Sequence, residues 1–478
     1  MSQELLTNEN RQGGSAQKLA NLFLCLALLV GFLLIFLEPP FVCPDENAHF
    51  MNICRISHGG LFADVNDGVS GSYMTVEEFV FLRDYGGRYN GAEAERFDWK
   101  TSSALSSIEP SEEMIFVPSH LSEINPTSYV LPAVLIMILR FFGIVLNGYN
   151  TLLIAKLFNL VFYALVIRLA ILKTGALRNT MFLLALMPMS IFQGASTSYD
   201  AYLISCSFLL FAYVTKILLE SDDYRITRGD LIAVAFSSVF IVNCKIAYAP
   251  LLLILLAIPI KKFGSLNRYF ACIGIVVGAV GLCYLIPTIV NGINTKDVVR
   301  VVKDEVIQHQ ELFYADVTVF PNVVISTIKH FGPYWMESFF GILGWLDTRF
   351  PLAFVLLFFL ISTLSAITEV SELKGIRWNT RLLSAGGVLI FLLGSIYVMY
   401  VTWTPDLTGI VGGVLAYGCQ GRYFIPVALF VVLAFANPLM KKIKVFEKIA
   451  FVREQTVCMT AIVYLAATVL LITVRYWC

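Results

Sequence analysis

The strongest constraint on this chain is a series of apolar runs, each long enough to cross a bilayer as a helix. A spanning helix needs about 20 mostly apolar residues, and runs near that length recur from 19–37 to 455–474. Of the 478 residues, 58% are hydrophobic and 14% are charged, whereas soluble domains carry about 25% charged residues. The sequence therefore predicts an all-α polytopic membrane protein.

About eleven runs qualify as membrane spans. We place them at about 19–37, 149–172, 179–197, 200–219, 231–244, 247–261, 268–290, 350–368, 383–402, 423–440 and 455–474. Another apolar stretch, 127–146, is interrupted by Pro132 and Arg140. If this stretch dips into the membrane and returns, Lys and Arg gather in the connections on one side, as the positive-inside rule requires. We therefore expect the N-terminus inside and the C-terminus outside.

This topology divides the chain into four parts. They are a cytoplasmic tail at 1–18, a transmembrane module at 19–290 that includes a first external loop at 38–148, a second external loop at 291–349, and C-terminal transmembrane helices at 350–478. We expect both loops to carry short helices on the membrane surface, with one in the second loop at 331–345. The formal net charge is zero, which gives no basic face for nucleic acid.

Two adjacent acids, Asp45 and Glu46, directly follow the first span. Acidic side chains beside a membrane are costly to desolvate, so they call for a functional explanation. The predicted topology brings further polar residues to the same outer face: His49, Asp200, Lys245, Asp347, Gln420, Arg422 and Tyr423. Acids, cations and aromatic side chains gathered on one face indicate an active site at the outer membrane surface.

Sugar transfer from a lipid-linked phosphate would use these groups. A carboxylate, Asp45 or Glu46, can take the proton of the acceptor hydroxyl. Arg422 and Lys245, beside Gln420 and Tyr423, can stabilise the departing phosphate. Asp45 and His49 are four residues apart, so on a helix they would form a hydrogen-bonded pair or, less commonly, bind Mg²⁺ or Mn²⁺. Asp200 as a helix cap, Lys245 as a snorkelling side chain and Asp347 as a turn residue remain open alternatives.

At these residues the chain resembles a bacterial membrane-protein family described as domain of unknown function 2142, over about 35–435. The resemblance rests on the following motifs, taken in order: Pro44-Asp45-Glu46-Asn47-Ala48-His49-Phe50, Ala155-Lys156-Leu157-Phe158-Asn159, Ala185-Leu186-Met187-Pro188-Met189, Ser196-Thr197-Ser198-Tyr199-Asp200-Ala201, Lys245-Ile246-Ala247-Tyr248-Ala249-Pro250, Gly344-Trp345-Leu346-Asp347-Thr348 and Gly418-Cys419-Gln420-Gly421-Arg422-Tyr423-Phe424-Ile425-Pro426. Two positions depart from the pattern. Tyr199 stands where proline is expected, and Lys156 where arginine is usual.

That family is similar to the GT-C superfamily of integral-membrane glycosyltransferases, which use polyprenyl-phosphate or polyprenyl-diphosphate sugars. The resemblance implies a GT-C-like helical bundle with a catalytic acid in the first external loop, which maps to Asp45. It also implies a Pro-aromatic motif, resembled here by Pro126-Thr127-Ser128-Tyr129, and a lysine between two short spans, which is Lys245. Because the family's own activity is unassigned, the reaction is an analogy at superfamily level.

We therefore expect a glycosyltransferase of the bacterial cytoplasmic (inner) membrane. It would transfer a sugar from a polyprenyl-phosphate donor to an extracytoplasmic glycan or lipid-linked acceptor in cell-surface polysaccharide synthesis. The alternatives are a polymerase or ligase that uses a lipid-diphosphate donor, a non-catalytic assembly protein, and a transporter of polysaccharide precursors. A transporter would usually place its site near the middle of the membrane, between internal repeats.

Overall fold

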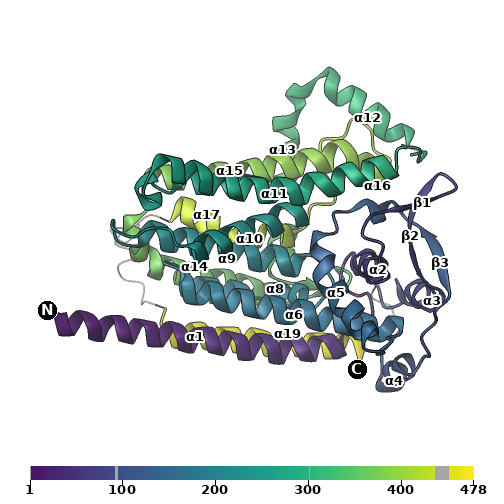
Figure 1. Cartoon of the computed structure of the whole chain (residues 1–478), viewed down its shortest axis with the longest axis horizontal. Helices are drawn as coiled ribbons and strands as arrows, with labels where there is room; N and C mark the ends of the chain where they lie inside the picture. The colour runs from purple at the N-terminus through teal and green to yellow at the C-terminus, as the bar shows by residue number, and fades with distance from the viewer. Residues whose placement is uncertain (1, 92–94, 301, 437–451) are drawn as a thin grey trace.

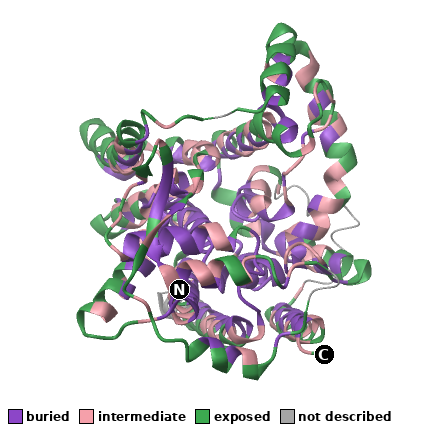
Figure 2. Ribbon diagram, turned by 90° about the vertical axis from the view of Figure 1, so that its right-hand side faces the viewer, coloured by how far each residue is buried: buried purple, intermediate pink, exposed green. Residues whose placement is uncertain are grey.

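A computed structural model of the chain describes residues 2–91, 95–300, 302–436 and 452–478. Long helices lie side by side in a bundle, and the external loops gather at one end of it (Figure 1). We call this the sheet end, because it carries a three-stranded sheet, and the opposite one the N-terminal end. Viewed along the bundle axis from the sheet end, buried residues occupy the centre of the bundle and exposed residues its outside (Figure 2).

Seven helices among the described residues are long and apolar enough to cross a membrane. They are α1 (Ser2–Leu37), α6 (Gly148–Lys173), α9 (Asp200–Leu219), α11 (Leu266–Asn294), α14 (Leu352–Glu369), α15 (Trp378–Val398) and α19 (Glu454–Tyr476). Side chains of α9 are mostly buried, whereas α11 exposes most of its apolar surface. The protein is therefore an all-α polytopic membrane protein with α9 near the centre of the bundle.

The other expected spans are shorter or broken. The run at 179–197 forms α7 (Arg178–Ala185) and α8 (Pro188–Gly194), because a residue before proline avoids the helical conformation. The runs at 231–244 and 423–440 form α10 (Arg228–Cys244) and α17 (Ala428–Phe435), and the end of the latter run lies outside the described residues. The run at 247–261 forms the 3₁₀ helices η2 (Ile246–Ala257) and η3 (Ile260–Phe263).

The 3₁₀ geometry of η2 explains how so short an element fits into the bundle. A 3₁₀ helix rises about 2.0 Å per residue and an α-helix about 1.5 Å. The 12 residues of η2 therefore extend roughly 24 Å instead of roughly 18 Å. Runs of 3₁₀ helix this long are uncommon, so η2 is an unusual wall element.

The helix α5 (Thr127–Phe141) begins and ends at the sheet end. Near its start, the Ser128 hydroxyl lies 3.0 Å from the thiol of Cys244, the last residue of α10. Near its other end, Arg140 donates to the carbonyl of Ser57 in the first external loop, and α6 starts shortly afterwards. This is the arrangement that the charge bias predicted for 127–146.

The first external loop contains more regular structure than expected. Besides the helices α2 (Glu46–Ser57), α3 (Val76–Tyr85) and α4 (Trp99–Ser106) and the short 3₁₀ helix η1 (His120–Glu123), it forms an antiparallel sheet of β1 (Asp64–Asn66), β2 (Val69–Thr75) and β3 (Met114–Pro118). Asp67 and Gly68 join β1 to β2 with positive φ angles of 49° and 75°, as a two-residue hairpin turn requires. The expectation of helices and loops alone was therefore incomplete.

The second external loop forms α12 (Asp304–Ala315) and α13 (Phe320–Phe340), which project from the side of the bundle (Figure 1). The helix expected at 331–345 is therefore present as part of α13, which starts earlier, at Phe320, and ends at Phe340. A short hairpin of β4 (Ile342–Leu343) and β5 (Thr348–Arg349) follows. Beyond α15 come α16 (Thr404–Thr408) and the short 3₁₀ helix η7 (Gly421–Phe424).

Candidate functional site

The site begins at a strained turn between α1 and α2. Phe41 and Asp45 both adopt left-handed backbone conformations, with φ of 62° and 65°. Such a conformation costs an ordinary residue about 1–2 kcal/mol, so it persists only where neighbouring contacts hold the chain. Asp45 immediately precedes α2, and 58% of its side chain is exposed. The turn therefore presents one carboxylate to solvent at the sheet end.

Three buried ionisable residues, Glu38, Glu46 and Lys156, hold this turn at both ends, and we call them the buried clamp. The Lys156 ammonium on α6 lies 3.2 Å from the Glu46 carboxylate and 3.7 Å from that of Glu38. Glu46 also accepts a hydrogen bond from the Thr197 amide. Burial raises the pKa of Glu38 to about 8, although Lys156 opposes the shift. Glu46 is thus a fully buried anchor, and Lys156, for which the sequence predicted no role, holds it.

Arg422 on η7 joins two of the expected acids. Its guanidinium lies 2.8 Å from the Asp45 carboxylate and 3.6 Å from that of Asp200. Burial alone would lower the pKa of Arg422, but Asp200 and Asp45 more than offset it, and the pKa is raised. Its Nε has no hydrogen-bond partner among the described residues. The cation is therefore fixed, nearly buried, and able to donate further.

A close approach of η7 to α13 holds Arg422 in place. A Cβ atom at Gly421 would overlap the Trp335 carbonyl oxygen, so only glycine fits at this contact. The Gly421 amide donates to the Ser338 hydroxyl at 2.8 Å. On the other side, the Tyr248 hydroxyl donates to the Tyr423 carbonyl at 2.8 Å. Arg422 thus lies on a segment that is fixed from two directions.

Lys245 supplies the second cation. It precedes η2, and its ammonium lies 3.6 Å from the centre of the Tyr423 ring, which is a cation–π contact. Asp200 interacts electrostatically with both Lys245 and Arg422. In the described part of the chain, no carboxylate lies within 4 Å of the Lys245 ammonium. Its charge is therefore available to an anionic ligand.

His49 and Tyr129 form a neutral pair behind Asp45. The Nδ1 atom of His49 lies 2.8 Å from the Tyr129 hydroxyl, and its ring meets Tyr199 edge-on at 4.9 Å. Burial lowers the pKa of His49 to about 4, with Asp45 opposing. Within the described ranges, no group of three or more His, Cys, Asp or Glu residues could hold a metal ion. His49 is therefore hydrogen-bonded to Tyr129, whereas the sequence suggested Asp45 as its partner.

Two other expected residues differ in their surroundings. Asp347 accepts from the Gly91 amide at 2.8 Å and lies 3.4 Å from Arg475 on α19, so its contacts belong to the C-terminal helix and not to Arg422. The Gln420 side-chain oxygen is buried beside Arg422 in the chain and has no hydrogen-bond partner among the described residues. Of these two residues, Gln420 is the one that has an unpaired polar atom near Arg422 in the chain.

An apolar cavity of about 580 Å³ opens between α14, α15 and α17. We call it the first groove. Phe339 and Phe424 line its sheet end, while Thr180 and Ala436 line its far end. Phe391, another lining residue, stacks on Tyr248 at 4.5 Å between ring centres. Because Phe424 follows Arg422 by two residues, the first groove leads to the polar site.

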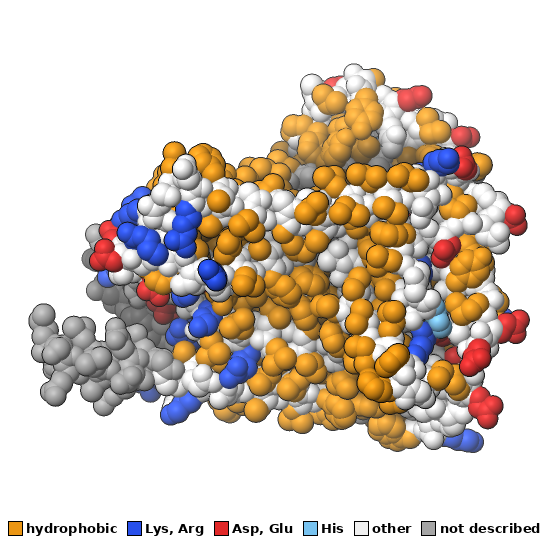
Figure 3. All heavy atoms as spheres, viewed as in Figure 1, with side chains coloured by type: hydrophobic (Ala, Val, Ile, Leu, Met, Phe, Trp, Pro, Cys, Tyr) orange, Lys and Arg blue, Asp and Glu red, His pale blue; other side chains and the backbone are white. Residues whose placement is uncertain are grey.

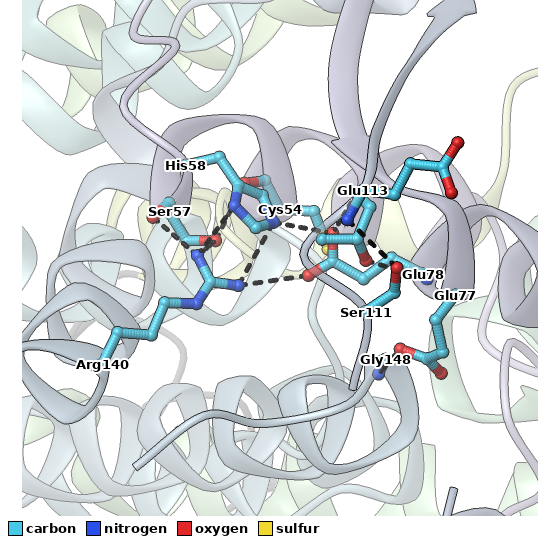
Figure 4. Close-up of polar contacts among 10 residues, drawn as sticks. Cys54, Ser57, His58, Glu77, Glu78, Ser111, Glu113, Arg140 and Gly148 are labelled. Atoms are coloured by element: carbon cyan, nitrogen blue, oxygen red, sulfur yellow. Dashed lines mark hydrogen bonds and ion pairs between the residues drawn. The ribbon is translucent and has the colours of Figure 1, made fainter. Parts of the chain in front are cut away.

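A separate polar cluster fixes the far end of α2 (Figure 4). The Glu78 carboxylate lies 2.8 Å from His58 and 3.2 Å from Arg140, and it also accepts from the Thr75 amide. Burial alone would raise the pKa of Glu78, but the contacts with His58, Thr75 and Arg140 lower it overall. This cluster joins the end of α2 to the start of α3 and to the end of α5. Together with the buried clamp, it holds α2 at both ends.

The fold and the site define a polytopic membrane protein with a cluster of charged residues at one end of a helical bundle. Residues 28–431 match the family described as "Predicted membrane protein (DUF2142)", so the chain belongs to that family. No match was found among curated proteins or among solved structures.

Proposed function

We propose that this protein is a membrane glycosyltransferase that moves a sugar from a polyprenyl-phosphate donor to an extracytoplasmic acceptor. One observation carries the proposal. The exposed Asp45 carboxylate lies 2.8 Å from the nearly buried Arg422, at the end of an apolar groove that could hold a lipid chain. A base, a phosphate-binding cation and a lipid groove are the three parts that this reaction needs.

In the proposed reaction, the acceptor hydroxyl oxygen attacks the anomeric carbon of the donor and gives its proton to Asp45. The bond between the anomeric carbon and the phosphate oxygen breaks, and its electron pair stays on the phosphate. Arg422 stabilises that negative charge, and Lys245 adds a second positive charge at the same mouth. Asp200 positions Arg422, and the buried side-chain oxygen of the nearby Gln420 has no hydrogen-bond partner among the described residues.

Glu46 has a different role in this proposal from that of Asp45. Its carboxylate is buried against Lys156 and Thr197, so it anchors the turn that presents Asp45. His49 and Tyr129 support the same turn from below α2.

The proposed orientation rests on the distribution of charge. On the face drawn in Figure 3, Lys and Arg side chains gather near the N-terminal end, acids line much of the sheet end, and hydrophobic side chains lie between them. Positive charge marks the cytoplasmic side of membrane proteins. We therefore place the sheet end, with Asp45 and Arg422, on the extracytoplasmic side of a bacterial inner membrane.

The test is sugar transfer by the purified full chain in lipid nanodiscs, with polyprenyl-phosphate sugars as donors. Asp45→Asn should lower turnover by about 10²–10⁴-fold, the usual contribution of a general base, because asparagine tolerates the left-handed turn but accepts no proton. Asp67→Asn is the matched control, since it removes an exposed acid from another left-handed position. Turnover in Asp45→Asn equal to the control would exclude Asp45 as the base, and no transfer by the unaltered chain from any such donor would refute the function.

A further inference from the structure

A second apolar cavity, of about 560 Å³, lies between η2, α11 and α15. We call it the second groove. Its lining is almost wholly apolar and includes Ala249, Pro250, Val277, Gly281 and Ile390. On α15, Ile390 lines the second groove and the adjacent residue, Phe391, lines the first. The two grooves therefore flank the same helix.

Direct contact between α15 and η2 forms the wall that separates the grooves. A Cβ atom at Gly387 of α15 would lie 2.6 Å from the Pro250 carbonyl oxygen, so the two backbones touch there. A 3₁₀ helix is also thinner than an α-helix, because it has three residues per turn. Between the thin η2 and the neighbouring α11, apolar space remains open. The second groove thus follows from the backbone geometry of η2.

Part of the lining of the second groove lies next to the same polar site in the chain. Ala249 and Pro250 in its lining directly follow Tyr248, whose hydroxyl donates to the Tyr423 carbonyl. Lys245 precedes the same helix, and its ammonium has no carboxylate within 4 Å in the described part of the chain. An apolar groove with an available cation at its mouth suits a lipid with an anionic headgroup.

We propose that the second groove holds the isoprenoid chain of a lipid-linked, phosphate-bearing acceptor. This inference rests on the proposed function and narrows it, since a water-soluble glycan acceptor would need no second lipid groove. Tyr423 lies between the two cations, 3.6 Å from the Lys245 ammonium and 5.5 Å from the Arg422 guanidinium. Both lipid headgroups would therefore meet around one aromatic ring, within reach of Asp45.

The binding test uses photoaffinity labelling of the full chain in nanodiscs with a diazirine-bearing polyprenyl phosphate, mapped by mass spectrometry. Labels should appear on both grooves. Gly281→Phe should reduce labelling of η2 and α11 by about tenfold. This is the loss of affinity expected when the added ring keeps roughly two methylene groups of the lipid chain from being buried in the groove. Labelling of α14 and α17 should persist. Gly278→Phe is the matched control, because an added Cβ meets nothing within 4 Å at either glycine and Gly278 does not line the groove.

Equal labelling of η2 and α11 in both variants would overturn the inference, as would equal competition by phosphatidylglycerol, which would indicate ordinary membrane lipid. A kinetic arm separates this inference from the proposed function. In the transfer assay, Gly281→Phe should raise the KM for a lipid-linked acceptor about tenfold and leave the KM for a short-chain acceptor unchanged. Transfer activity with an unchanged KM for the lipid-linked acceptor would refute the second groove alone, whereas two-groove labelling without any transfer would refute the proposed function alone.

Discussion

At the scale of residues, Asp45 and Glu46 are neighbours in the chain with opposite surroundings. The left-handed turn at Asp45 leaves its carboxylate exposed beside Arg422, whereas Glu46 is buried against Lys156. The strain of the turn is held by the buried clamp on one side and by Arg422, which also donates to the Pro44 carbonyl at 3.4 Å, on the other. The clamp therefore determines where the exposed carboxylate lies.

The buried clamp makes stability depend on pH. Burial raises the folded-state pKa of Glu38 to about 8 from an ordinary value of 4.5. The folded state therefore binds more protons than the unfolded state between these values, and the free energy of unfolding falls as pH rises through that window. We predict that Glu38→Gln, which stays neutral, removes most of this fall. Thermal unfolding in detergent at pH 6 and pH 8.5 measures it.

Glu95→Gln, at an exposed ion pair with Arg88, is the control and should keep the pH dependence of the unaltered chain. If Glu38→Gln shows the same loss of stability between pH 6 and pH 8.5 as this control, Glu38 is not the group that titrates.

The sequence was sufficient to predict which four charged residues meet at the site. Asp45, Arg422, Asp200 and Lys245 were expected together, because hydropathy and charge bias place all of them at one membrane surface, and the structure brings them together. The sequence did not indicate that Lys156 binds Glu46, because a lysine inside an apolar span shows its partner only after the helices pack. It also gave Asp347 no partner, since Arg475 is far away in the chain.

At the scale of elements, the contact between η7 and α13 matters most, because it carries Arg422. Gly421 lies against the backbone of Trp335 and Phe339, with no room for a side chain. We predict that Gly421→Ala pushes η7 away from α13 and lowers turnover by about 10²-fold, the usual loss for a misplacement of about 1 Å. The overpacking should also lower the free energy of unfolding by about 1–3 kcal/mol.

The transfer assay and thermal unfolding measure these two effects. Gly332→Ala on α13 is the control, because an added Cβ there meets nothing within 4 Å. Turnover in Gly421→Ala that matches Gly332→Ala would show that Arg422 keeps its function without this contact.

Elements were predictable where one physical signal dominated. Charge bias correctly kept α5 at one end of the bundle, because crossing would have inverted every later connection. The external sheet was missed although Asp67-Gly68, a strong hairpin signal, was present in the sequence. Phe116 pairs with Tyr73 across β2 and β3 and covers Gly71, and such cross-strand contacts emerge only from the folded sheet. The hydropathy of the sequence does not distinguish the 3₁₀ helix η2 from an α-helix.

At the scale of the whole molecule, the end of α19 joins both external loops. The Phe97 amide of the first loop donates to the Tyr476 carbonyl at 2.8 Å, and the Trp477 indole donates to the Leu37 carbonyl at 2.7 Å. Arg96 and Arg475 also bond to carbonyl groups across this junction. Asp347 of the second loop completes it through Gly91 and Arg475. The junction closes the sheet end around the site.

We predict that Asp347→Asn weakens this junction without touching the chemistry. Losing hydrogen bonds to a charged group should lower the free energy of unfolding by about 1.5–3 kcal/mol, while turnover per folded molecule stays unchanged. Asp406→Asn, which breaks an exposed pair with Lys303, should change stability by no more than about 1 kcal/mol. A large loss of turnover in correctly folded Asp347→Asn would contradict this prediction and indicate that Asp347 acts in the active site.

The ion pair between Asp45 and Arg422 has a consequence for the order of substrate binding. In this ion pair, the proposed base and the proposed phosphate-binding cation neutralise each other. A donor phosphate must displace the carboxylate from Arg422, which Asp200 continues to hold from behind. We therefore expect the donor to bind first and the acceptor second, because only a displaced Asp45 is free to accept a proton.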